Sequence, residues 1–242
     1  MERSIITPLI FILSLLMTTV SSASIITNGM PTPGGNAFPF TTGAYDAGGR
    51  YQQIYSSELF DSSIIIDSIG FASSTDIEEV DRSVLYDVDI FFSTTSRAPN
   101  MFFEDNVDLN AHIGPDVARV FSGLLQTTLD GSSNSVFDLI FPTTNFQYNP
   151  DIGNLLVDIV FNADALLLTP GRNTSSFTVI HQSFPPLSGR IFQSFGVGTP
   201  AADSTSLYTQ FTTVPEPSTL VLLFIGFLLL FYQRRRKQEY MG

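Results

Sequence analysis

Apolar and polar residues alternate with a period of two along much of the chain between residues 50 and 213. The run 86–92 places four large side chains on one face: Tyr86, Val88, Ile90 and Phe92. Its other face carries Asp87, Asp89 and Phe91. The run 155–161 repeats the pattern, with Asp158 opposite an apolar row made of Leu155, Val157, Ile159 and Phe161. This period is typical of strands that turn one face to a core.

Nine short runs of β-branched or aromatic residues predict nine strands; several of the runs alternate in this way, and turn signals such as Asp130-Gly131 and Pro185-Pro186 separate them. The predicted strands are Tyr51–Tyr55, Ser63–Ala72, Val84–Thr94, Ala118–Ser122, Val136–Phe141, Leu155–Phe161, Phe177–His181, Arg190–Phe195 and Ser206–Phe211. They indicate a mainly β domain over residues 50–213, an antiparallel β-sandwich of jelly-roll or immunoglobulin-like type, with a barrel as the alternative. A parallel β-helix is disfavoured because no repeat of fixed period occurs.

Residues 24–49 precede this domain and are rich in Gly, Pro, Thr and Asn. They show no periodicity, so we expect an irregular lead with a short edge strand near 37–45.

The first 23 residues have the features of a secretory signal peptide. Arg3 precedes an apolar run over residues 5–20, and the small residues Ser21 and Ala23 follow at the positions that a signal peptidase accepts. The sequence therefore predicts export, with cleavage after Ala23.

The other end of the chain combines a short apolar segment with a basic cluster. Residues 220–232 hold no charge, and thirteen helical residues span about 20 Å, against about 30 Å for a hydrocarbon core. We expect a thin or tilted transmembrane helix over 219–233. The cluster after it, Arg234, Arg235, Arg236 and Lys237, is expected to stay in the cytoplasm, which leaves the domain before Pro215 outside.

Pro215, Glu216 and Pro217 stand directly before this segment. The order of Pro-Glu-Pro, short apolar helix and basic end, over residues 214–237, resembles the PEP-CTERM sorting signal of Gram-negative bacteria. The resemblance implies that an exosortase in the membrane is the partner that cuts the chain near the motif and passes it from an inner-membrane intermediate to the cell surface or the extracellular space. Two prolines around one residue also favour extended backbone, the form that proteases bind. The β-rich domain likewise resembles the ectodomain of many such proteins.

Composition narrows the range of functions. The chain of 242 residues has no Cys, which excludes disulfides and a thiol nucleophile. Residues 24–217 keep 21 acidic residues and six arginines, a net charge of −15. Such a charge disfavours nucleic acid as a partner.

The sequence contains no convincing catalytic arrangement. His112 and His181 lack the spacing of a metal or catalytic site, so we expect surface or turn histidines. Neither a Gly-x-Ser-x-Gly elbow nor a phosphate-binding loop is present. Carboxylate pairs occur at Glu58 with Asp61, Glu78-Glu79 with Asp81, and Asp87 with Asp89, but their spacing is generic. We expect no enzymatic activity, with a secreted hydrolase as the weakest alternative.

Calcium is the one cofactor that the sequence suggests. Glu104, Asp105 and Asp108 gather oxygen donors in one predicted loop, and residues 76–81 form a second acidic run. Neither run matches the twelve-residue EF-hand loop, and a solubilising acidic loop is the favoured interpretation of both.

Aromatic residues on the strands suggest a second possible function. Sugars stack on exposed rings, and the candidates are Tyr51, Tyr55, Phe91, Phe146, Tyr148 and Tyr208. The leading hypothesis is a non-enzymatic surface or matrix protein, held by membrane lipid before processing. The alternative is a carbohydrate-binding sandwich that acts on exopolysaccharide.

Overall fold

The computed structural model describes residues 23–36, 39–40, 49–74, 82–99, 108–129, 136–162, 166–168, 177–181, 187–193, 200–203, 205–215 and 226. Nearly all described elements are strands: β1 Ser24–Thr27, β2 Thr32–Asn36, β3 Arg50–Tyr55, β4 Ile64–Ala72, β5 Arg82–Thr95, β6 Ala118–Leu129, β7 Phe137–Tyr148, β8 Asn154–Phe161, β9 Leu166–Leu167, β10 Phe177–His181, β11 Ser188–Gln193, β12 Ala201–Asp203, β13 Thr205–Leu207 and β14 Thr209–Pro215. Two 3-10 turns, η1 Ser57–Leu59 and η3 Leu109–His112, join them. The prediction of a mainly β chain is confirmed.

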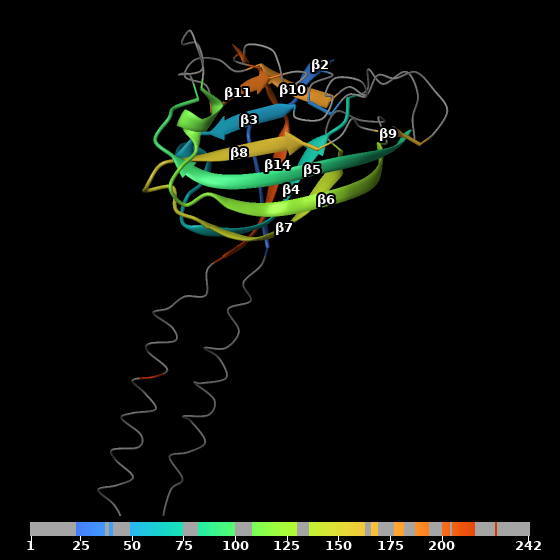
Figure 1. Cartoon of the computed structure of the whole chain (residues 1–242). Helices are drawn as coiled ribbons and strands as arrows, with labels where there is room; N and C mark the ends of the chain where they lie inside the picture. Colours follow the sequence, from blue (N-terminus) through green and yellow to red (C-terminus); the bar gives the residue numbers. More distant parts are fainter. Residues whose placement is uncertain are drawn as a thin grey trace, which may run out of the picture. The chain divides into compact units, whose positions relative to one another are not determined.

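Two antiparallel sheets face each other across one core (Figure 1). One has four strands in the order β1-β14-β4-β7. The other has seven, in the order β12-β11-β3-β8-β5-β6, with β9 paired to β5 beyond this path. A third, small sheet has the order β13-β10-β2. Two sheets with facing apolar sides are the layout of a β-sandwich.

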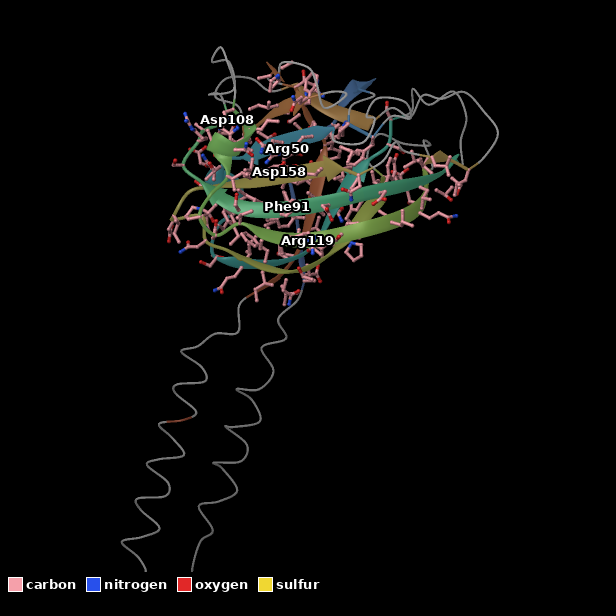
Figure 2. All side chains as sticks on the ribbon, in the orientation of Figure 1. Arg50, Phe91, Asp108, Arg119 and Asp158 are labelled. Carbon is pink, nitrogen blue, oxygen red and sulfur yellow. The ribbon has the colours of Figure 1, made fainter. Side chains whose placement is uncertain are left out.

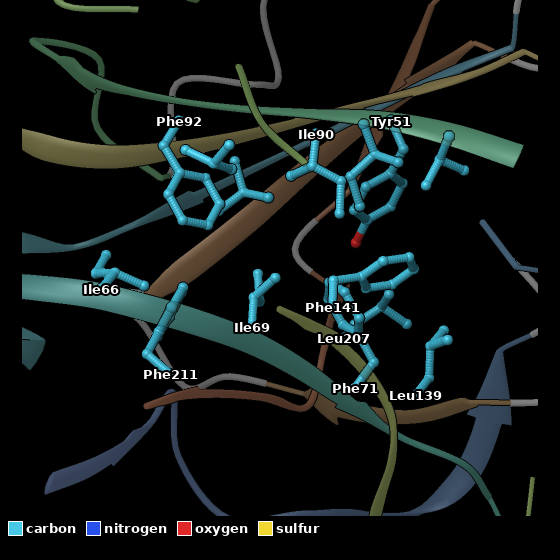
Figure 3. Packing of buried hydrophobic residues seen from close by; sticks show 14 of the residues in the cluster. Tyr51, Ile66, Ile69, Phe71, Ile90, Phe92, Leu139, Phe141, Leu207 and Phe211 are labelled. Atoms are coloured by element: carbon cyan, nitrogen blue, oxygen red, sulfur yellow. The ribbon is translucent and has the colours of Figure 1, made fainter. Parts of the chain in front are cut away.

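The alternating pattern predicts correctly which residues form the core. Tyr86, Val88, Ile90 and Phe92 of β5 and the apolar row of β8 are all buried. Figure 3 shows side chains of both sheets meeting in this layer, with Tyr51, Ile90 and Phe92 on one side and Ile66, Ile69 and Phe71 on the other. Apolar contact between the sheets therefore holds the two layers together.

The segment predicted to be irregular contributes two strands and a core residue. β1 pairs with β14, from Ser24 opposite Thr213 to Thr27 opposite Gln210, and β2 pairs with β10. The ring of Phe40 is fully buried and lies within 6.0 Å of four other rings. Most of the predicted strand near 37–45 lies outside the described residues.

The largest differences from the predicted strands lie in β6, in β7 and in the segment 206–211. β6 continues through Gly123, which takes a positive φ of 113°, a conformation that glycine adopts without strain. β7 continues through Pro142, which an edge strand accepts because it needs fewer N–H donors. The predicted strand 206–211 is divided at Tyr208 between β13 and β14.

A buried polar network joins segments that are distant in the sequence. The Asn28 side chain donates to Ser188 Oγ at 3.1 Å and to Leu207 O at 2.8 Å, and it accepts from Thr209 N at 2.8 Å. Tyr55 Oη donates to Thr209 Oγ1 at 2.8 Å, and burial raises the pKa of Tyr55 well above its ordinary value. The network ties β14, which leads to the Pro-Glu-Pro motif, to the centre of the domain.

Within the described part of the chain, no helix is long and apolar enough to cross a membrane. The predicted transmembrane segment 219–233 lies outside the described residues except for Gly226, which is helical.

Candidate functional site

The two predicted processing points lie at one end of the β1–β14 pair. Ala23 is exposed and directly precedes β1, and Pro215 is the last residue of β14. The hydroxyls of Ser24 and Thr213 lie 2.6 Å apart, so the starting residue of the predicted mature chain is bonded close to the motif. Ser21, Glu216, Pro217 and the basic cluster 234–237 lie outside the described residues.

A second candidate site lies on the outer face of the seven-stranded sheet. Four residues on neighbouring strands stand directly opposite one another and share this face: Gln52, Asp158, Phe91 and Arg119. A parallel row is made of Arg50, Val160, Asp89 and Ser122, two residues along on β3, β8 and β5 and three along on β6, where the register shifts. Figure 2 shows Arg50, Asp158, Phe91 and Arg119 following one another across the sheet. We call these two rows together the outer-face strip.

An ion pair fixes one part of the outer-face strip. Arg50 Nε donates to Asp158 Oδ1 at 2.8 Å, and Nη2 donates to Oδ2 at 2.5 Å. Arg50 Nη1 also donates to Asn110 Oδ1 at 2.8 Å. The Asp158 side chain is only 5% exposed, and its hydrogen bonds raise the pKa of Arg50 above its ordinary value. This bidentate geometry locks both side chains against the sheet.

The turn η3 covers the β3 end of the strip. Leu109 packs against Ile54, Leu156 and Ile191 on the outer face. Gln52 donates to Leu109 O at 2.9 Å, and its Oε1 lies 3.1 Å from His112 Nδ1. His112 lies in the turn η3, as one of the two predicted alternatives has it, but it is only 7% exposed, so the alternative of a surface histidine is wrong for this residue. The sequence could not show this, because Gln52 and His112 are 60 residues apart.

Protonation of His112 should weaken the fold at low pH. Burial, reinforced by Arg97, lowers the pKa of His112 from its ordinary value of 6.5. The unfolded chain therefore binds a proton first, and stability is lost as the pH falls below about 6.5. This loss cannot exceed the one-proton slope of about 1.4 kcal/mol per pH unit. In a His112→Gln variant, which keeps a side chain able to bond Gln52, unfolding free energies from denaturant titrations should fall less between pH 7 and pH 5. Equal slopes in both proteins would contradict this prediction.

Several of the described acidic side chains accept hydrogen bonds within the domain: Asp87, Asp108, Asp116, Asp138 and Asp158. Asp108 caps η3 by accepting from Asn110 N at 2.9 Å, while Glu104, Asp105 and residues 76–81 lie outside the described residues. Asp87 and Asp89 share the outer face of β5 as predicted, and Asp87 accepts from Asn162 at 3.2 Å. Oδ1 of Asp89 is buried and accepts no hydrogen bond from the described residues. Among these residues no group of three metal-ligating side chains occurs.

Of the six aromatic candidates for sugar stacking, five are buried. They are Tyr51, Tyr55, Phe146, Tyr148 and Tyr208. Phe91 alone of the six is partly exposed, and it lies at the centre of the outer-face strip. Two charged residues of the strip were not identified from the sequence: Arg119, which stands opposite Phe91 on β6, and Arg50, which pairs with Asp158. The registers of β5 with β6 and of β3 with β8, which place them there, have no local signal.

Comparison with known proteins identifies one segment. Residues 213–237 match the family described as the PEP-CTERM protein-sorting motif. The chain thus carries an exosortase-recognised sorting signal at its C-terminal end, as the resemblance implied, and the match begins within β14. No curated protein matches the chain.

Proposed function

We propose that this chain is a non-enzymatic protein of the cell surface or extracellular matrix, which an exosortase processes at Pro215–Pro217. The sorting motif over 213–237 implies an exported, exosortase-processed protein, and this single observation carries the proposal. The β14 strand supports it, because the folded domain leads directly into the motif in extended form.

The proposed route uses both ends of the chain. The signal peptide 1–23 directs export, and the helix 219–233 holds the exported chain in the membrane with Arg234–Lys237 in the cytoplasm. The strongly acidic domain then lies outside the cell. Asp158 and Asp116 support a structural rather than catalytic use of the carboxylates, because the first pairs with Arg50 and the second accepts from Thr94.

We further propose that the sandwich is a jelly roll. A jelly roll has eight strands, numbered 1 to 8 in chain order. They form two sheets, in which the strands follow one another in the orders 1-8-3-6 and 2-7-4-5. Numbering β1, β3, β4, β5, β6, β7, β8 and β14 from 1 to 8 gives β1-β14-β4-β7 and β3-β8-β5-β6, which are the observed orders. Under this assignment β11, β12 and β9 are additions at the edges.

Carbohydrate binding is the second candidate function, with exopolysaccharide as the partner. It is favoured by one observation, the partly exposed Phe91, which lies on the outer face of the sheet between Asp158 on β8 and Arg119 on β6. Lectin domains are among the proteins built on jelly rolls.

Replacing Pro215, Glu216 and Pro217 together by alanine should abolish processing. Alanines remove the restricted backbone and the carboxylate that distinguish the motif from the apolar segment after it. We expect nearly all of the protein to remain uncut in the membrane fraction, measured by immunoblot of cell fractions. The control is Thr212→Ala, which changes β14 outside the motif. Normal release of the triple variant would refute the proposed processing.

A further inference from the structure

We propose that the outer-face strip binds a neutral polysaccharide chain, with Phe91, Arg119, Asp89 and Ser122 as its contacts. This inference rests on the carbohydrate-binding candidate above and adds the place and the class of ligand. The two rows cross four strands, β3, β8, β5 and β6. The turn η3 covers the β3 end and Asp158 on β8 is buried, so the four contacts lie on β5 and β6, about 4.8 Å apart across the strands, and a short part of a polysaccharide chain covers them.

The strip combines three kinds of contact that a sugar chain uses. Phe91 offers a partly exposed ring for the apolar face of a sugar. Arg119 and Ser122 are exposed and supply donors, and the partly exposed Asp89 supplies a carboxylate acceptor. Phe91 and Arg119 are direct neighbours across β5 and β6, and Asp89 and Ser122 pair in the next row. One ligand can therefore contact all four.

The floor of the strip is already rigid. Asp158 stands directly opposite Phe91 on β8, and Arg50 holds it by two hydrogen bonds while Asn110 holds Arg50. We assign Arg50 and Asp158 a positioning role, because the Asp158 side chain is 5% exposed and has its hydrogen-bond partners. Side chains locked before binding lose little entropy when a ligand arrives.

The charges select a neutral ligand. Arg50 and Arg119 balance Asp158 and Asp89, so the strip itself has no net charge. Paired donors and acceptors match hydroxyl groups, each of which both donates and accepts. The domain around the strip carries a net charge of −15 over residues 24–217, which repels polyanions such as uronic acid polymers.

The test is native electrophoresis of the full chain, in a detergent without a sugar headgroup, through gels that contain one polysaccharide each. The panel has neutral chains (dextran, a β-glucan and a galactomannan) and anionic ones (alginate and hyaluronate). At least one neutral gel should retard the protein, and no anionic gel should. Phe91→Ala and Arg119→Gln should each weaken the apparent affinity about tenfold. Phe91→Tyr should keep it, and Ile140→Ala, 43% exposed in β7 of the other sheet, should leave it unchanged.

The outcomes test separately the position of the site, the carbohydrate-binding function and the class of ligand. Retardation that Phe91→Ala and Arg119→Gln leave unchanged would overturn the strip as the site, while the carbohydrate-binding function stands. A wild-type protein that no neutral gel retards would overturn both. Retardation in the anionic gels would overturn the neutral class of ligand. Arg119 is exposed, so Arg119→Gln should fold even where Phe91→Ala loses stability, and a melting curve of each variant checks this.

Discussion

Replacing Phe40 by alanine should destabilise the domain by about 4 kcal/mol, the cost of removing a large ring from a closed core. The ring centroid of Phe40 lies 4.9 Å from that of Phe71, 5.4 Å from Tyr86, 5.8 Å from Phe161 and 6.0 Å from Phe141. These four residues come from both sheets, so the cavity would open between the layers. The melting temperature of the full chain, followed by near-ultraviolet circular dichroism of its tyrosines, should fall by roughly 10 °C.

Met30→Ala is the matched control. Met30 comes from the same N-terminal stretch as Phe40 but is 83% exposed, so its truncation should change the stability by less than about 0.5 kcal/mol. If Phe40→Ala lowered the stability as little as Met30→Ala, the ring of Phe40 would not be part of the core. The expectation of an irregular lead over residues 24–49 would then stand for this residue.

The failure to predict this stretch has a physical cause. Local patterns identify a strand by its own alternation, and β1 and β2 are too short and too rich in Thr, Pro and Gly to show one. Long-range partners decide instead: β14 pairs with β1, and Asn28 bonds to Thr209, 181 residues away. By contrast, β5 and β8 have long alternating runs, so the sequence predicts both their extent and their buried faces.

The candidate site could be predicted only in part, again because its residues are distant in the sequence. The alternation in β5 places Asp87, Asp89 and Phe91 on one face, and the structure confirms it. It does not say which residues of neighbouring strands join them, because Arg50 and Asp158 are 108 residues apart. The alternation also does not distinguish an exposed ring from a buried one. Tyr148 is aromatic like Phe91, but it is buried: burial raises the pKa of Tyr148, and its hydroxyl donates to Gly153 O.

Replacing Gly114 by alanine should cost at least about 3 kcal/mol, because the new methyl group has no room. A Cβ on Gly114 would lie 1.8 Å from Thr94 O and 2.7 Å from Thr94 C, which are backbone atoms of β5. The loop cannot move away freely, since Gly114 N donates to Ser93 Oγ at 3.1 Å and Asp116 accepts from both Thr94 N and Thr94 Oγ1 at 2.6 Å. Equilibrium unfolding in urea measures the loss.

Gly70→Ala separates this effect from a general effect of losing a glycine. A Cβ at Gly70 in β4 would meet Ile140 Cγ1 at 3.4 Å and Phe137 Cβ at 3.5 Å, which are ordinary contacts. The change should be neutral, or stabilising by up to about 1 kcal/mol, because alanine restricts the unfolded chain more than glycine. If the Gly114→Ala protein were as stable as the Gly70→Ala protein, the close contact between Gly114 and the backbone of Thr94 in β5 would be wrong.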